Sequence, residues 1–153
     1  MFNVVLFEPE IPQNTGNIAR LCAATGCNLH LIGPLGFSLA DRKLKRAGLD
    51  YWHLVDVHVY DDYADFTAKH AGQKFYYLTT KGTNYYTEFN YQPGDFFIFG
   101  SETHGLPEDL IKANQELCLR IPMVQGARCL NLSNSVAIVI YHALYKQKFR
   151  GLS

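Results

Sequence analysis

Short apolar runs alternate along this chain of 153 residues with longer segments in which apolar side chains recur at helical spacing. The runs predict buried strands, and the helical spacing predicts amphipathic helices. Strands are expected at residues 2–7, 28–32, 53–59, 74–79, 95–99 and 117–121, and helices at 17–25, 40–46, 63–70, 107–113 and 133–148. Because strands and helices alternate, we predict an α/β fold with a mostly parallel sheet and helices on both of its faces.

Two segments, at 136–140 and 82–94, do not follow the simple alternation of strands and helices. The run at 136–140 has the composition of a strand, but apolar residues spaced along one helical face favour a helix. Those residues are Val136, Val139, Ile140, Ala143 and Leu144. This face can belong to the core or to an interface between two copies of the chain, and the sequence does not separate the two. Residues 82–94, rich in Tyr, Asn and Thr, are expected to form an irregular connection.

Three segments of short polar and glycine residues lie at predicted junctions between elements, at 14–20, 99–107 and 128–135. Ligands of open α/β sheets collect outside the carboxyl ends of the strands, so the three segments predict one shared site. A helix start needs only one capping side chain. The third segment offers Asn131, Ser133, Asn134 and Ser135. A capped helix without a ligand is the simpler alternative.

These three segments, the third taken together with residues 121–123, resemble the sequence motifs of the SPOUT-class (α/β-knot) RNA 2′-O-ribose methyltransferases. The resemblance covers essentially the whole chain. Residues 8–17 and 46–51 are similar to the branch that methylates the ribose at the wobble position of certain leucine tRNAs. The resemblance implies a single domain over residues 1–153, a C-terminal trefoil knot threaded from about Ile121, and a homodimer. It also implies that the partner is tRNA, bound through the anticodon stem-loop, with cytidine or uridine as the methylated nucleotide.

By the same resemblance, S-adenosylmethionine donates the methyl group and no metal is required. The residues expected to bind this cofactor are Leu78, Thr79, Gly100, Glu102, Ile121, Met123, Cys129 and Leu130. The catalytic candidate is Arg20, and the substrate-side candidates are Asn14, Ser133, Asn134 and Tyr141. A guanidinium is not deprotonated in proteins. We therefore expect Arg20 to bind the RNA phosphate and ribose and to stabilise the developing alkoxide, while another acceptor takes the proton.

The net charge of zero gives no general sign of a nucleic-acid partner, because RNA binders usually carry a basic excess. The basic residues Arg42, Lys43, Lys45 and Arg46 are instead concentrated within a few positions. They are expected on a helix opened by a capping box of Ser38 and Asp41. This group is either an RNA-binding surface or a solvated helix face, and the sequence leaves both open.

The remaining chemistry-bearing residues mainly exclude other classes of protein. The four cysteines form no C-x-x-C pair, and Cys22 and Cys118 are expected in the core. Cys129 stands where the family usually has Ser, and His104 stands where it often has a basic residue. No G-x-G-x-x-G, P-loop or H-E-x-x-H pattern is present.

No signal peptide or membrane-spanning stretch is recognisable, so we expect a cytoplasmic protein. The alternative to a methyltransferase is an α/β protein that binds RNA or an adenosine-containing ligand without catalysis. Arg20 and the polar third motif favour the enzyme, because a binding protein needs no cation beside a methyl donor.

Overall fold

A computed structural model describes the backbone of residues 1–153 and all side chains except those of residues 48 and 49. The strands are β1 (Asn3–Phe7), β2 (Asn28–Ile32), β3 (Val57–Tyr60), β4 (Phe75–Leu78), β5 (Asn84–Tyr85), β6 (Phe96–Phe99) and β7 (Cys118–Arg120). The helices are α1 (Pro12–Thr25), α2 (Arg42–Gly48), η1 (Leu49–Leu54), α3 (Tyr63–Lys69), α4 (Glu108–Ala113), η2 (Gln115–Leu117) and α5 (Leu132–Lys146). The predicted α/β class is confirmed.

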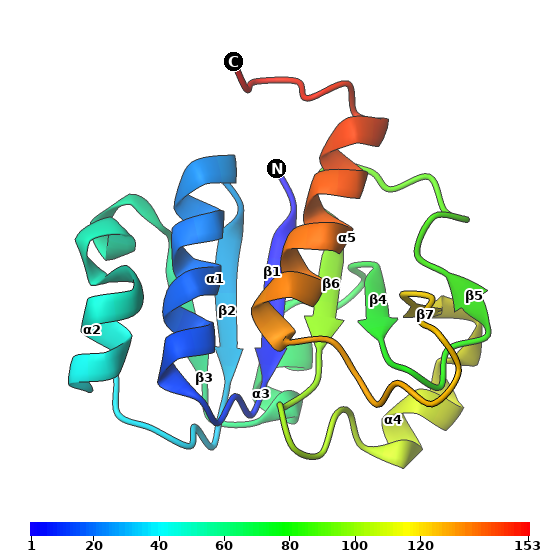
Figure 1. Ribbon diagram of the computed structural model, residues 1–153, viewed down its shortest axis with the longest axis horizontal. Helices are drawn as coiled ribbons and strands as arrows, with labels where there is room; N and C mark the ends of the chain where they lie inside the picture. The colour runs from blue at the N-terminus through cyan, green and yellow to red at the C-terminus, as the bar shows by residue number, and fades with distance from the viewer.

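The strands form one parallel sheet in the order β3-β2-β1-β6-β4-β7-β5. Helices α1 and α5 lie side by side on one face, with α2 outside α1, and α3 and α4 lie on the other face (Figure 1). Alternate side chains of β1 point to opposite faces of the sheet. Val4 and Leu6 belong to the apolar cluster on one face, and Val5 and Phe7 belong to the cluster on the other. Because all the strand pairs are parallel, the carboxyl ends of the strands lie at one edge of the sheet.

Helix α1 is longer than predicted, because it begins at Pro12 rather than at Asn17. Proline is favourable in the first turn, where its missing N–H has no helical acceptor. Gly16 lies where α1 meets α2, and a Cβ built on it would lie 2.4 Å from the Ala47 Cβ. Glycine at this position therefore lets the two helices pack closely.

The predictions for residues 40–59 were partly wrong. The strand expected at 53–59 is only Val57–Tyr60, because the residues before it form η1. Helix α2 begins at Arg42, and the Asp41 carboxylate accepts from the Lys43 N–H at 2.7 Å. The Ser38 hydroxyl instead accepts from the Ala40 N–H at 3.1 Å, within the preceding turn. The cap is therefore Asp41, and Ser38 does not act as a capping-box residue.

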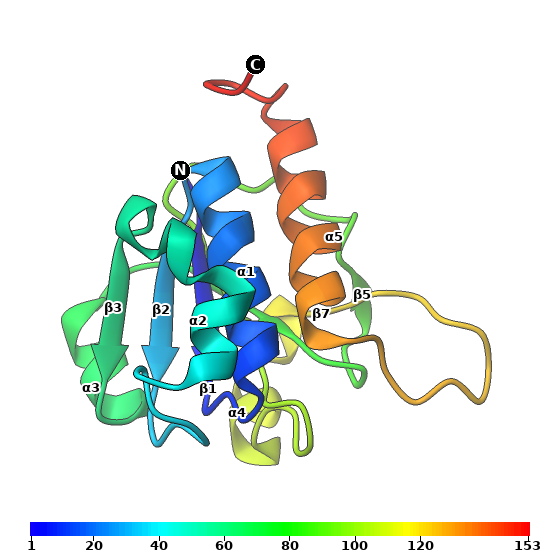
Figure 2. The ribbon, with the colours of Figure 1, turned by 60° about the vertical axis from the view of Figure 1, so that its left-hand side comes forward.

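The helix predicted near the C-terminus is confirmed as α5. Its apolar stripe from Val136 to Leu144 is almost completely buried against the sheet, so that face belongs to the core. The connection at 82–94 contains the short strand β5, which pairs with β7 and was not predicted. Between β7 and α5 the chain makes a wide loop (Figure 2). The threading of this segment into a knot stays a prediction from the resemblance.

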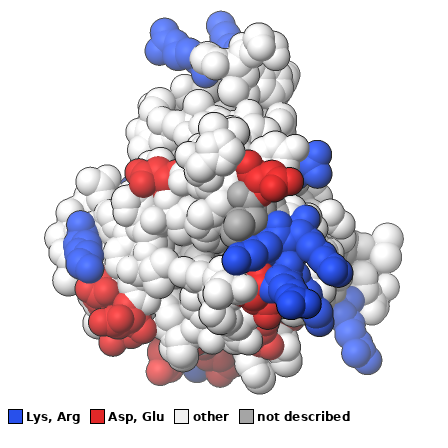
Figure 3. Space-filling model, turned by 90° about the vertical axis from the view of Figure 1, so that its left-hand side faces the viewer, with Lys and Arg blue, Asp and Glu red and all other residues white. Residues whose placement is uncertain are grey.

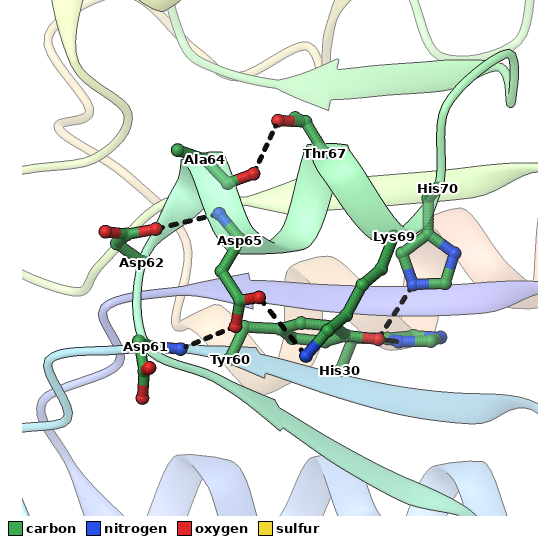
Figure 4. A network of polar contacts seen from close by, with 9 residues as sticks. All are labelled: His30, Tyr60, Asp61, Asp62, Ala64, Asp65, Thr67, Lys69 and His70. Carbon is green, nitrogen blue, oxygen red and sulfur yellow. Dashed lines mark hydrogen bonds and ion pairs between the residues drawn. The ribbon is translucent and has the colours of Figure 1, made fainter.

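A buried polar network lies on the α3 face of the sheet (Figure 4). The His30 ring contacts the Tyr60 hydroxyl through Nδ1 at 2.9 Å and the Asn3 Oδ1 through Nε2 at 3.0 Å. The Tyr60 hydroxyl also contacts His70 Nε2 at 2.8 Å. Burial and the neighbouring His58 and His70 lower the pKa of His30 to about 3. His30 is therefore neutral at physiological pH. No described helix is long and apolar enough to cross a membrane.

Candidate cofactor and substrate site

A cavity of about 650 Å³ lies at the carboxyl ends of β4, β6 and β7. All of the residues expected to contact the cofactor line it, namely Leu78, Thr79, Gly100, Glu102, Ile121, Met123, Cys129 and Leu130. They lie at 78–79, 100–102 and 121–130, three parts of the chain that meet because parallel strands end at the same edge of the sheet. Asn14 and Asn131 also line this cavity, so each of the three predicted segments contributes to it. It is here called the cofactor cavity.

Gly100 is required by the loop that follows β6. A Cβ built on Gly100 would lie 2.2 Å from the Gly105 carbonyl carbon. The loop closes on itself through the Gly105 N–H, which donates to the Ser101 carbonyl at 2.9 Å, and through the His104 N–H, which donates to the Ser101 hydroxyl at 3.2 Å. Glycine is therefore needed for the packing of this turn.

The Glu102 carboxylate is held by the start of α1. It accepts from the backbone N–H of Glu10 at 2.8 Å and from that of Ile11 at 3.0 Å. The side-chain amide of Asn14 adds a longer contact of 3.4 Å. Glu10 and Ile11 directly precede Pro12, so the carboxylate lies near the N-terminus of α1, where a negative charge interacts favourably with the helix dipole. Glu102 lines the cavity, but these contacts give its carboxylate a structural role.

Asn131 joins the third segment to the first and caps α5. Its side-chain amide donates to the Asn14 Oδ1 at 3.0 Å, and its own Oδ1 accepts from the Ser133 N–H at 2.9 Å and the Asn134 N–H at 3.3 Å. Glu102, Asn14 and Asn131 thus form a hydrogen-bonded chain across all three segments. Sequence reasoning placed Asn131 at a helix start but did not select it as a site residue. Its capping position was the available signal.

Arg20 and Tyr141 do not lie at the cofactor cavity of the same chain. Arg20 is exposed on α1, and its guanidinium carbon lies 5.0 Å from the centre of the Tyr51 ring. Tyr141 is 43% exposed on α5. Ser133 and Asn134 occupy the first turn of α5 without lining the cavity, and the Ser133 hydroxyl donates to Asn131. One chain therefore brings together the predicted cofactor residues and Asn14, but not the other substrate candidates.

A second cavity of about 450 Å³ adjoins the first, at the carboxyl ends of β1, β2 and β6. The loop residues Ser101, His104, Gly105 and Leu106 line both cavities. Glu10 lines the second cavity, and its Oε2 accepts from the Thr103 hydroxyl at 2.7 Å. This hydrogen bond lowers the pKa of the Glu10 carboxyl, which is therefore ionised at neutral pH.

The cysteines lie in two kinds of environment. Cys22 and Cys118 are buried as expected, and burial raises the pKa of both thiols. Cys129 is exposed at the cofactor cavity. Among the described residues no group of three or more His, Cys, Asp or Glu side chains is placed to hold a metal ion.

Comparison with known proteins agrees with this arrangement. The profile of the SpoU rRNA Methylase family matches residues 1–141. A putative tRNA (cytidine(34)-2'-O)-methyltransferase of Geobacillus stearothermophilus is 54% identical over 154 residues, covering 99% of this chain and 98% of that protein. The tRNA (cytidine(34)-2'-O)-methyltransferase of Escherichia coli K12 is 50% identical over 152 residues, covering 99% and 97%.

A solved structure described as giving insight into 2-OH methylation of C/U34 on tRNA superposes with a TM-score of 0.93. It is 43% identical, and the match covers 98% of both chains. The parallel sheet, with its cofactor cavity at the carboxyl ends of the strands, has the architecture of an RNA methyltransferase. The chain belongs to the SpoU methylase family. It is a methyltransferase, so the alternative of a binding protein without catalysis is set aside.

Proposed function

We propose that this protein transfers the methyl group of S-adenosylmethionine to the ribose 2′-hydroxyl of the wobble-position cytidine or uridine of tRNA, with leucine tRNAs as substrates. The observation that carries this proposal is the convergence of Leu78, Gly100, Ile121 and the other expected cofactor residues on one cavity. Relatives that are 50% and 54% identical over almost the whole chain are named for methylation of cytidine 34 of tRNA. The leucine preference comes from the resemblance of residues 8–17 and 46–51.

The residues of the cofactor cavity fit S-adenosylmethionine. Its volume lies within the range of sites for cofactors. Leu78, Leu119 and Ile121 supply apolar walls suited to an adenine ring, and the strand ends supply backbone groups for its polar edge. The bound cofactor supplies an electrophilic methyl group whose leaving group is a neutral thioether. This chain therefore has to position a ribose hydroxyl in line with that methyl and to accept its proton.

Arg20 is proposed to bind the phosphate and ribose of the target nucleotide and to stabilise the developing alkoxide. Because Arg20 is exposed and does not line the cofactor cavity of its own chain, we propose that it acts at the cavity of a second copy. A homodimer is supported by apolar side chains on the outer side of α5, where Ile138 is 37% and Tyr145 65% exposed. Tyr141 lies on the same side.

The basic side chains of α2 are proposed to bind the tRNA backbone. Leu44 is buried, and this orientation leaves Arg42, Lys43, Lys45 and Arg46 exposed. Figure 3 shows a dense group of basic side chains on this face of the molecule. None of the ion pairs found among the described side chains involves these four residues. Phosphate binding by such a group requires no positive net charge over the whole chain.

Mapping of 2′-O-methyl nucleotides in tRNA from cells that lack this gene tests the proposal. We expect the methyl group to be lost from position 34 of leucine tRNAs and restored by the wild-type gene. Unchanged methylation at position 34, or loss from another RNA, would overturn the proposed substrate.

A further inference from the structure

We propose that the cavity beside the cofactor cavity receives the target base, and that the Glu10 carboxylate accepts a hydrogen bond from the exocyclic amine of cytosine. This inference rests on the proposed function and adds to it the residue that distinguishes cytidine from uridine. The sequence between β1 and α1 carries Glu8 and Glu10 immediately before the first motif, and neither residue has a part in the chemistry described above.

The walls of this cavity suit a pyrimidine ring. Phe7, Pro34, Leu35, Leu106 and Pro107 supply apolar surface. Glu8, Glu10, Ser101 and His104 supply a small set of polar groups. A nucleobase has the same division, with apolar faces and a polar edge, and proteins bind unstacked bases between apolar or aromatic side chains. The volume of about 450 Å³ is sufficient for one base.

The position of the cavity matches the reaction. The loop from Ser101 to Leu106 separates it from the cofactor cavity and lines both. The two cavities are therefore neighbours, and a nucleotide with its ribose at the cofactor cavity can place its base in the second cavity. Glu102 fixes the arrangement, because its carboxylate accepts from the backbone N–H of Glu10 and thus ties the segment carrying Glu10 to the loop.

Glu10 has one carboxylate oxygen without a protein partner. Its Oε2 accepts from Thr103, whereas its Oε1 is buried and makes no hydrogen bond. An oxygen without a donor is free to accept a further hydrogen bond, and the end torsion of a glutamate is soft enough to turn that oxygen toward a ligand. An ionised carboxylate only accepts hydrogen bonds. The cavity therefore favours a ligand that brings a donor to this position.

Cytosine brings that donor as its N4 amine, whereas uracil places the O4 acceptor at the same position. The Ser101 hydroxyl and the His104 ring can donate to the remaining acceptors of the base edge. A carboxylate facing O4 of uracil makes no hydrogen bond and repels it. A discrimination of about tenfold is the size expected for one such contact to a base edge.

The test uses paired anticodon stem-loop RNAs that differ only in having C34 or U34, with single-turnover methyl transfer as the readout. The wild-type protein should methylate C34 about tenfold faster than U34. In Glu10→Gln the side chain keeps an acceptor for Thr103 and gains a donor for O4, so the C34 to U34 ratio should fall to near one or below. Glu116→Gln is the matched control, because Glu116 is exposed on η2 and lines neither cavity.

A second measurement changes the substrate, so that it does not depend on the folding of a variant. RNA with N4,N4-dimethylcytidine at position 34 has no amine hydrogen to donate, and wild-type protein should methylate it about as slowly as the U34 RNA. Equal rates for cytidine and its dimethyl form, or an unchanged ratio in Glu10→Gln, would overturn the role of Glu10 and leave the proposed function intact. If wild-type protein methylates neither C34 nor U34, the proposed function fails and this inference fails with it.

Discussion

At the scale of single residues, Glu102 lines the cofactor cavity, but we expect it to stabilise the structure around the cavity rather than to bind the cofactor. Its carboxylate accepts hydrogen bonds from the backbone N–H groups of Glu10 and Ile11, just before α1. Glu102→Gln should lower the free energy of unfolding by about 1–2 kcal/mol, because the amide nitrogen of Gln cannot accept from these groups. Urea unfolding measures this change. Glu108→Gln is the control, since the Glu108 carboxylate also lies at a helix start but is paired at the surface with Lys81. Unchanged stability with weaker S-adenosylmethionine binding would instead make Glu102 a direct ligand.

Arg20 gives the second prediction at this scale. Arg20→Ala should leave S-adenosylmethionine affinity close to wild type, because Arg20 lies outside the cofactor cavity of its own chain. Methyl transfer to tRNA should fall about a hundredfold, the usual loss for one charge-stabilising donor. Arg20→Lys should restore little, because a point charge cannot reproduce a two-pronged contact.

Arg20 also contacts the Tyr51 ring, so its packing role needs a control. Tyr51→Leu removes this contact and should retain most of the activity. Near-normal single-turnover rates in Arg20→Ala would show that Arg20 has no part in catalysis.

The sequence predicted which residues surround the cofactor cavity better than it predicted their contacts. The eight residues expected to bind the cofactor came from the family resemblance, and the structure places them around one cavity. The chain of Glu102, Asn14 and Asn131 could not be predicted, since its members lie 88 and 117 positions apart and meet only through the order of the strands. The orphaned oxygen of Glu10 likewise depends on the neighbouring loop.

At the scale of elements, periodicity identified the long buried elements and failed where polar contacts with residues distant in the sequence are involved. Helix α5 was predicted because its apolar stripe is long and regular. Helix α1 begins before its apolar stripe, at Pro12, directly after the two residues whose backbone N–H groups are held by Glu102 from another segment. A contact with a distant residue is not visible in the local sequence.

Helix α2 gives the prediction at this scale. Alanine at Arg42, Lys43, Lys45 and Arg46 should weaken tRNA binding and reduce the slope of log affinity against log salt by about one for each lost phosphate contact. S-adenosylmethionine affinity should not change. Titration of tRNA at several salt concentrations measures the slope.

Alanine at Lys69 and Lys112 is the control, because these lysines lie on α3 and α4 at the other face of the sheet. If the slope for the α2 variant equals that of wild type, the four residues are only a solvated face of the helix.

At the scale of the whole molecule, the His30 network couples folding to pH. The pKa of His30 is about 3 in the folded protein, below the unperturbed value of 6.5. The unfolded chain therefore binds more protons between these values, and stability falls as the pH drops below about 6.5. From pH 7 to pH 5 the loss attributable to His30 should be about 2 kcal/mol. His70 acts in the same direction, because burial lowers its pKa as well.

Urea unfolding at both pH values checks this prediction. His30→Gln, which has no titrating group, should show a smaller loss of stability between them. His53→Gln is the control, because His53 is exposed. An equal pH dependence in wild type and His30→Gln would contradict the assignment.

The knot and the dimer are also properties of the whole molecule, and neither follows from the local pattern. A threaded chain leaves no signature in hydrophobic spacing, and base rates would exclude it. The buried stripe of α5 was consistent with either core or interface until the structure placed it in the core. The apolar side chains left outside, Ile138 and Tyr145 among them, are those proposed to meet a second copy.

The most direct test measures methyl transfer itself. The protein, S-adenosylmethionine and a leucine anticodon stem-loop with C34 are combined without added metal, and the RNA is digested and analysed by mass spectrometry. We predict one methyl group on the ribose of nucleotide 34, and none when that nucleotide is 2′-deoxycytidine. A methyl group on a base, on another nucleotide or on the deoxy substrate, or no methyl group on C34 RNA, would contradict the proposal that this protein is a wobble-position ribose methyltransferase.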